Sequence, residues 1–136
     1  MRQAILAAVL IVSGALVALA QDARNLEIEG TIQGQIEAFL ADDFAAAFAF
    51  ASPNIRRIFG NSDSFGSMVR QGYPMVWRPA DVRFLELREL GGRTLQRVMI
   101  RDQAGIFHVL EYQMLVGENG WQIDGVRIVP KAEVGA

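Results

Sequence analysis

The chain has 136 residues, a formal net charge of −2 at pH 7, 51% hydrophobic residues and 21% charged residues. This length fits one modest domain, and the composition excludes intrinsic disorder for most of the chain. The slightly negative charge excludes a nucleic-acid partner, because such a partner requires clustered positive charge. The absence of cysteine excludes a disulfide scaffold, a thiolate nucleophile and a thiolate zinc site.

The first 20 residues have the pattern of a secretory signal peptide. Arg2 supplies an early positive charge, and residues 4–19 are apolar apart from one serine and one glycine. The small residues at positions 18 and 20 predict cleavage after Ala20. We therefore expect a periplasmic or secreted protein that has no membrane attachment once the signal is removed. The alternative is an uncleaved membrane anchor, although a span requires about 20 apolar residues.

Residues 21–130 are predicted to form a single α+β domain, and residues 131–136 a C-terminal tail. Apolar residues recur every three to four positions over residues 28–40, which predicts an amphipathic helix. Gly30 and Gly34 interrupt this pattern, and we expect both to permit close packing against a neighbouring element.

Three short helices are expected next, each beginning at a residue that can cap a helix N-terminus. The segment after them contains two prolines, which favour an extended crossing over residues 73–79. The expected capping residues are Asp42, Ser52 followed by Pro53, and Ser62 or Asp63.

The second half of the chain contains strand-like runs joined by short connections that contain glycine. Such connections are typical of hairpins between antiparallel neighbours. The predicted fold is α+β, with short N-terminal helices packed on a curved four-stranded antiparallel β-meander. The expected strands are Val82–Leu90, Arg93–Asp102, Ile106–Val116 and Trp121–Val129.

Counting outward from the glycine turns predicts which residues lie opposite one another. A two-residue turn at positions 91–92 pairs Leu90 with Arg93 and sets the register of the first hairpin. The other predicted partners are Glu86 and Arg97, Phe84 and Met99, Met99 and His108, Leu95 and Tyr112, Met114 and Ile123, and Val116 and Trp121.

This register divides the sheet into two unequal faces, and we expect the helices to cover the face with large and polar groups. That face comprises Phe84, Glu86, Leu95, Arg97, Met99, His108, Leu110, Tyr112, Met114, Trp121 and Ile123. The other face is expected to stay bare, and an exposed apolar patch indicates self-association or a protein partner. Its aliphatic end comprises Leu85, Leu87, Val98, Ile100, Phe107, Val109, Val126 and Ile128.

Several local motifs resemble a proteobacterial family of small exported proteins known as a domain of unknown function. They are the junction Val69-Arg70-Gln71-Gly72-Tyr73-Pro74, the pair Arg78-Pro79, and Gly120-Trp121-Gln122-Ile123-Asp124-Gly125-Val126. The resemblance covers residues 26–129 and implies no activity or catalytic residues. More loosely, the layout resembles the nuclear-transport-factor-2-like superfamily, in which helices and a curved sheet form a cone with a cavity. That superfamily includes ketosteroid isomerase, polyketide-cyclase-like enzymes and non-catalytic binding modules, and fold analogy does not choose among them.

Six side chains are candidate ligand-binding residues, each with a structural alternative. The single histidine and the tyrosines and tryptophan are more often core or roof residues than binding groups. The glutamate and arginine form either a structural cross-strand ion pair or a pair that orients a ligand. No catalytic residue, metal site or cofactor is predicted. The six candidates are Tyr73, Trp77, Glu86, Arg97, His108 and Tyr112.

The main functional prediction is a non-catalytic periplasmic binding or interaction module with a small apolar cavity. The ligand is expected to be a small apolar molecule, and the bare sheet face a site for a homodimer or protein partner. One alternative is an isomerase or dehydratase that uses Glu86 as a base, with Tyr112 or His108 as a hydrogen-bond donor. A second alternative is a purely structural envelope component.

Overall fold

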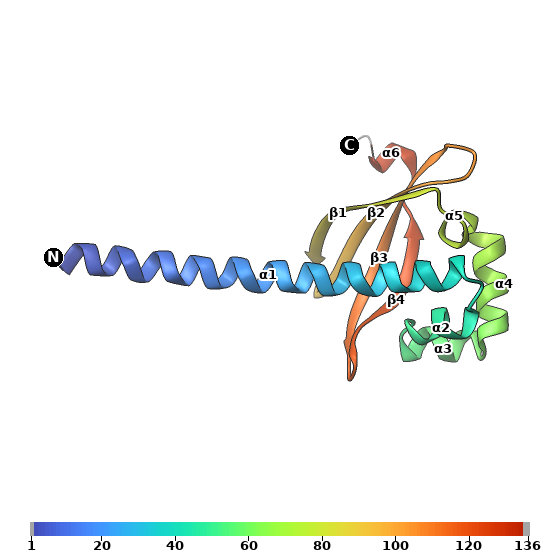
Figure 1. Ribbon diagram of the computed structural model, residues 1–136, viewed down its shortest axis with the longest axis horizontal. Coiled ribbons are helices and arrows are strands. Elements are labelled where there is room, and N and C mark those ends of the chain that lie inside the picture. The colour runs from blue at the N-terminus through green and yellow to red at the C-terminus, as the bar shows by residue number, and fades with distance from the viewer. Residues whose placement is uncertain (1, 135–136) are drawn as a thin grey trace.

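The computed structural model describes the backbone of residues 2–134 and, from Leu16 onward, every side chain to Val134 except those of Val17 and Gln21. Helix α1 (Arg2–Leu40) is continuous, and its N-terminal half extends away from the rest of the chain (Figure 1). Met1 and the side chains up to residue 15 lie outside the described residues. The signal peptide, together with cleavage after Ala20, therefore stays a prediction.

The predicted α+β class is confirmed, because helices occupy the first half and strands the second (Figure 1). Ser52 caps α3 by accepting a hydrogen bond from the amide of Ile55, and Pro53 occupies the first turn, as predicted. The remaining helices are α2 (Phe44–Ala49), α3 (Pro53–Phe59), α4 (Ser62–Gly72), α5 (Pro74–Trp77) and α6 (Lys131–Val134).

Two of the predicted capping residues are wrong. Asp43, and not Asp42, accepts the capping hydrogen bond of α2. Asp42 has a φ of 54°, and its carboxylate is held elsewhere by two hydrogen bonds of 2.8 Å from Arg78. Asn61 caps α4 by accepting a hydrogen bond of 2.8 Å from the amide of Ser64, so neither Ser62 nor Asp63 does so.

The segment over residues 73–79 is helical in part, so the predicted extended crossing is wrong. Pro74 occupies the first turn of α5, where its fixed φ is compatible with a helix and its missing N–H is not needed. The predicted tail also contains structure, because residues 131–134 form α6. Gly135 and Ala136 lie outside the described residues.

The four predicted strands form one antiparallel sheet in the order β1-β2-β3-β4, which confirms the meander. Helices α1 to α5 gather on one side of this sheet, and α1 crosses it (Figure 1). The strands are β1 (Asp81–Leu90), β2 (Arg93–Arg101), β3 (Phe107–Gly117) and β4 (Gly120–Ile128).

The register is correct at the turns of the first and last hairpins and wrong across the middle one. Among the predicted partners, Leu90 with Arg93, Met114 with Ile123, and Val116 with Trp121 are confirmed. In the middle hairpin, the observed partners are Val109 for Met99 and Gln113 for Leu95, where His108 and Tyr112 were predicted.

Asp102 organises the loop that causes this shift. The amide of Asp102 donates to the carbonyl of Ile106 at 2.9 Å, and the amide of Gly105 donates to the carbonyl of Asp102 at 3.0 Å. The Asp102 carboxylate accepts from the amides of Ala104 and Ile106, each at 2.9 Å. The predicted pairing corresponds to a loop one residue shorter, and a shift of one residue exchanges the two faces of a strand.

The predicted pairing of Phe84 with Met99 is also wrong, because a bulge lies directly after Phe84. It places Phe84 opposite Val98 instead of Met99. The amide nitrogen of the buried Gln96 donates a hydrogen bond of 2.9 Å to the carbonyl of Leu85 within the bulge. This bond stabilises a carbonyl that the disrupted ladder leaves free.

As predicted, the helices cover the face of the sheet that includes Tyr112 and Trp121, but part of the predicted membership of each face is wrong. The side chains packed into the core beneath the helices include Val98, Ile100, Leu110, Tyr112, Met114 and Ile123, with Phe84, Leu87, Trp121 and Val126 partly buried. Leu87, Val98, Ile100 and Val126 were predicted on the bare face. Conversely, the register places Leu95, Arg97 and Met99, predicted beneath the helices, on the opposite face.

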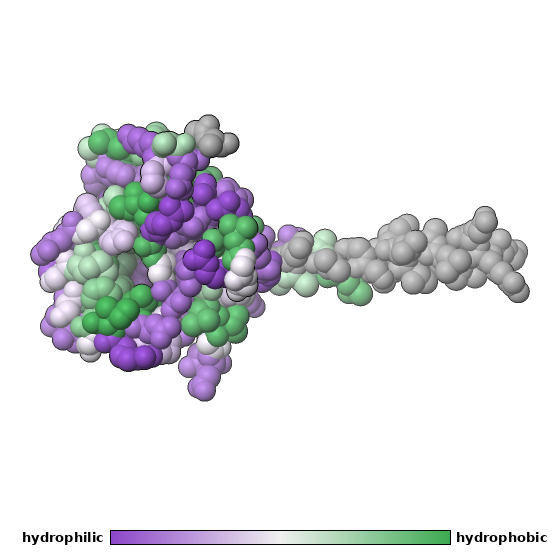
Figure 2. All heavy atoms as spheres, turned by 180° about the vertical axis from the view of Figure 1, so that it is seen from behind, coloured by the Kyte–Doolittle hydropathy of each residue, from purple (hydrophilic) through white to green (hydrophobic). Residues whose placement is uncertain are grey.

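We call this opposite side of the sheet the outer face, and its centre is charged. Glu111 is 8% exposed and accepts hydrogen bonds of 3.0–3.2 Å from Arg88, Arg97 and Arg127. Figure 2, the view from behind, shows hydrophilic side chains interspersed with separate hydrophobic patches. The prediction of a continuous aliphatic surface on this face is therefore wrong. Association through the outer face stays a prediction, and an exposed apolar patch no longer supports it.

Helix α1 supplies one wall of the core through Ile28, Ile32 and Ile36, each fully buried. Gly34 permits close packing, as predicted, because a Cβ there would lie 2.7 Å from the ring of Phe50. Gly30 has no such neighbour within 4 Å, so the same prediction for Gly30 is wrong. Among the helices whose side chains are described, none has the length and apolar character to span a membrane.

Candidate functional site

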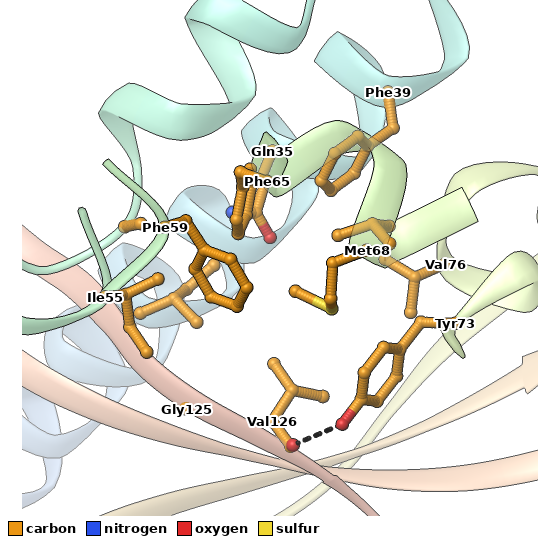
Figure 3. Close-up of a pocket in the computed structure, with 13 residues that line it drawn as sticks. Gln35, Phe39, Ile55, Phe59, Phe65, Met68, Tyr73, Val76, Gly125 and Val126 are labelled. Carbon is orange, nitrogen blue, oxygen red and sulfur yellow. Dashed lines mark hydrogen bonds between the residues drawn. The ribbon is translucent and has the colours of Figure 1, made fainter. Parts of the chain in front are cut away.

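A cavity of about 240 Å³ lies between the helices and β4 (Figure 3). The C-terminal part of α1, helices α3 to α5, and β4 contribute its walls. Ile55, Phe59 and Met68 are only half-buried, so the cavity reaches the surface on the side of α3 and α4. The 13 residues of the lining are Gln35, Phe39, Ala51, Ile55, Phe59, Phe65, Met68, Val69, Tyr73, Val76, Ile123, Gly125 and Val126.

The chain between α2 and α3 is attached to β4, and this attachment positions one wall. The amide of Ser52 donates to the carbonyl of Ile123 at 2.8 Å, and the amide of Ile123 donates to the carbonyl of Phe50 at 2.9 Å. The hydroxyl of the fully buried Ser52 donates a hydrogen bond of 2.6 Å to Asp124. These bonds fix the start of α3, which carries Ile55 and Phe59 into the lining.

A cluster of aromatic rings forms the helical side of the cavity. Phe65 is its centre, with ring centroids 5.9 Å from Phe39, 5.3 Å from Phe48 and 5.7 Å from Phe59. Tilted and offset pairs at these separations are favourable beyond the area they bury. The cavity therefore lies beside a well-packed aromatic wall. Loose packing of the helices as a whole does not explain it.

Two polar side chains enter the otherwise apolar lining. Tyr73 donates its hydroxyl to the carbonyl of Val126 at 3.1 Å (Figure 3). Gln35 is 3% exposed, and its amide nitrogen donates to the carbonyl of Ala47 at 3.1 Å. Figure 3 shows the amide oxygen of Gln35 turned toward the cavity. No lining residue carries a formal charge at neutral pH.

Of the six predicted binding residues, only Tyr73 lines the cavity. Tyr112 is fully buried on the same face of the sheet, but it does not reach the lining. Burial raises the pKa of the Tyr112 hydroxyl well above its usual value. Within the part of the chain that is described, this hydroxyl has no hydrogen-bond partner.

Trp77 belongs to a structural contact at the end of α1. Its indole N–H donates to Asp42 at 3.0 Å, and the guanidinium of Arg78 lies 4.2 Å from its ring centroid. Arg78 also donates to the carbonyl of Phe39 at 2.8 Å, where α1 ends. The hydrogen bonds from Trp77 and then Arg78 lower the pKa of Asp42. Trp77 thus stabilises the α1–α5 junction.

Glu86 and Arg97 lie on the outer face, away from the cavity. The predicted ion pair is present, with 3.7 Å between Oε1 of Glu86 and Nε of Arg97. Arg97 also donates to Glu111 at 3.2 Å. Burial opposes ionisation of Glu111, but the hydrogen bonds from Arg97, Arg127 and Arg88 outweigh it and lower its pKa. The expected meeting of Glu86 with Tyr112 on one face is therefore wrong.

His108 lies near the start of β3, next to the loop that joins β2 to β3. Its Nε2 is 2.8 Å from Oδ2 of Asp102, the residue that organises the adjoining loop. Hydrogen bonding to His108, followed by that of the Ile106 amide, lowers the pKa of Asp102. Neither residue lines the cavity. Across the described side chains, no three histidine or acidic residues gather in an arrangement that could hold a metal ion.

Sequence reasoning missed most of the cavity, although one signal was available. Gln35 interrupts the apolar face of α1 between Ile32, Ile36 and Phe39, and a polar residue on a buried face requires a partner. The phenylalanines and Met68 carried no comparable signal, because apolar residues at helical spacing are also typical of a filled core.

Comparison with one solved structure supports this fold. A nuclear-transport-factor-2-like protein of unknown function from Shewanella oneidensis MR-1 aligns with a TM-score of 0.50 and 15% identity, covering 76% of this chain and 97% of its own. A second such protein of unknown function, from Burkholderia pseudomallei K96243, aligns with a TM-score of 0.37 and 19% identity, covering 78% and 92%. No curated protein matches the chain.

The expected family resemblance is confirmed, and so is the expected nuclear-transport-factor-2-like fold. The match to the family model extends over residues 21–136, which is most of the chain and begins directly after the predicted signal peptide. The chain belongs to the family described as domain of unknown function DUF4864, and its fold is nuclear-transport-factor-2-like.

Proposed function

We propose that this protein is a non-catalytic module that binds a small apolar molecule in the cavity between α3, α4 and β4. The observation that carries the proposal is the combination of an open hollow of about 240 Å³ and a nearly apolar lining. Ligand sites are typically concave and apolar, with a few polar groups that fix orientation.

The size of the cavity limits the ligand. A cavity of about 150 Å³ is large enough to bind benzene. By proportion, about 240 Å³ accommodates on the order of ten non-hydrogen atoms, such as a fused bicyclic ring or a short branched hydrocarbon. A larger molecule would have to extend past Ile55 and Met68 into solvent.

The composition of the lining favours binding over catalysis. An isomerase or dehydratase requires a base placed against its substrate. Carboxylate, imidazole and lysine groups do not occur among the lining residues. Glu86, which was considered as this base, lies on the outer face, and His108 is paired with Asp102.

Thermal unfolding of the full chain with indene tests the proposal. Indene is a neutral bicyclic hydrocarbon of suitable size. A ligand that binds only the folded state stabilises it by about 2.7 kcal/mol when present at about 100 times its Kd. We expect the Tm to rise with indene concentration along this relation. An unchanged Tm up to the solubility limit would contradict ligand binding and favour the structural envelope component.

The proposed location of this activity is the periplasm or the extracellular space. The N-terminal pattern ending at Ala20 supports export, and so does a family match that starts at Gln21. Mass spectrometry of the protein from a periplasmic fraction tests this. We expect a mature N-terminus at Gln21, whereas recovery of the intact chain from the membrane would contradict it.

A further inference from the structure

The polar groups of the cavity define the chemistry of its occupant more narrowly than its size does. Gln35 is almost fully buried, and its amide nitrogen is committed to the carbonyl of Ala47 at 3.1 Å. Because a carbonyl only accepts hydrogen bonds, this contact fixes which end of the amide is nitrogen. The oxygen therefore faces the hollow, as Figure 3 shows, and no described residue donates a hydrogen bond to it.

The second polar group in the lining is also an acceptor. Tyr73 uses its only proton to bond the carbonyl of Val126 at 3.1 Å, so only lone pairs of its oxygen remain available. The lining side chains thus turn two hydrogen-bond acceptors toward the hollow, Oε1 of Gln35 and the hydroxyl oxygen of Tyr73. An apolar occupant that fills the hollow would cut these acceptors off from water, and an acceptor buried without a donor is costly. An occupant that supplies a proton is therefore favoured.

Resting on the proposed function, we infer that the cavity selects a neutral molecule with one hydrogen-bond donor, which binds Oε1 of Gln35. An alcohol, a phenol or a ring N–H meets this requirement. A carboxylate does not, because it offers only acceptors and would be buried without a positive partner. An ammonium group is excluded by the same cost, since no carboxylate lies in the lining.

Three probes of similar size separate these possibilities in calorimetric titrations of the full chain. Indole has a ring N–H where indene has a methylene group, and benzoate carries a negative charge. A neutral hydrogen bond contributes about 1 kcal/mol net, so we expect indole to bind about fivefold more tightly than indene. We expect no measurable binding of benzoate.

Substitution of Gln35 tests whether its side-chain oxygen causes the preference for indole over indene. Gln35→Met keeps the length of the side chain and removes the acceptor, and the carbonyl of Ala47 retains a hydrogen bond from the amide of Phe50 at 3.2 Å. We expect this variant to bind indole and indene equally. Gln33→Met, on the same helix but outside the lining, is the matched control and should retain the fivefold preference.

The outcomes distinguish this inference from the proposed function. Equal binding of indole and indene by the unaltered chain overturns the inference and leaves an apolar binding site. Binding of benzoate as tight as that of indole overturns the requirement for a neutral ligand. If neither indole nor indene binds, the proposed function fails, and the inference with it. The comparison in the unaltered chain is decisive even if Gln35→Met does not fold.

Discussion

Filling the cavity should stabilise the protein while it abolishes ligand binding. Val126 on β4 points into the hollow opposite Met68 (Figure 3), and Val126→Phe would place an aromatic ring there. At about 24 cal/mol per Å³, a volume of about 240 Å³ corresponds to at most about 6 kcal/mol of lost packing. Because one ring fills only part of this volume and some strain is expected, we predict a gain of about 1–2 kcal/mol.

Thermal and urea unfolding of the variant and the unaltered chain, each with and without indene, test this prediction through the Tm and the free energy of unfolding. For a domain of this size, the gain corresponds to a rise in Tm of about 5 °C. The further rise that indene causes in the unaltered chain should disappear. The matched control is Ile128→Phe, which adds the same ring on the same strand outside the lining. A Val126→Phe variant that is destabilised, or that still responds to indene, would refute the assignment of this cavity.

Three further predictions test the fold around the site. Glu111→Gln should lower the free energy of unfolding by about 2 kcal/mol at pH 7, because three arginines lose a charged acceptor. The pKa of Glu111 in the folded protein lies below its usual 4.5. The stabilisation by Glu111 should therefore be present above about pH 4.5 and vanish as the pH falls through the native pKa. Urea unfolding at a series of pH values measures this dependence. Ser52→Ala should cost about 1–2 kcal/mol in the same assay, because it removes the α3 cap and a buried hydrogen bond. Gly34→Ala should destabilise the protein, because the new Cβ would lie 2.7 Å from the ring of Phe50. Gly30→Ala should instead stabilise α1 by about 1 kcal/mol, because nothing lies within 4 Å of its new Cβ. Equal effects of the two substitutions on the free energy of unfolding would contradict the packing described.

The order of elements could be predicted from the sequence because its signals are local. Ser52 and the proline after it mark the start of α3, and the glycine turns at 91–92 and 117–120 set the two outer hairpins. These features depend on neighbouring residues alone. The class, the meander and the family resemblance were correct for this reason.

The faces of the sheet depend on events that the sequence does not mark. The Asp102 loop moves the middle register by one residue, and this exchanges the faces of β2. Val98 consequently lies in the core and Arg97 on the outer face. Bulges after Phe84 and after Gln113 add further irregularities. Glu86 and Arg97 lie on the outer face, away from the cavity, because their predicted positions relied on an uninterrupted register.

A small apolar cavity was predicted from the sequence, but most of the residues that line it were not. A hollow forms where packed elements fail to meet, and that depends on how α3 and α4 sit on β4. Residues such as Phe59 and Met68 look the same in a sequence whether they fill a core or line a hollow. Gln35 was the one informative position, because it places an amide among apolar neighbours on a buried helix face.

The central claim, that the cavity binds a small apolar molecule, is tested most directly by nuclear magnetic resonance of methionine methyl groups during titration with indene. Met68 lines the cavity, whereas Met99 lies on the outer face and provides an internal control. We predict a saturable shift of the Met68 methyl resonance and an unchanged Met99 resonance. An unchanged Met68 resonance, or equal shifts of both, would contradict the claim.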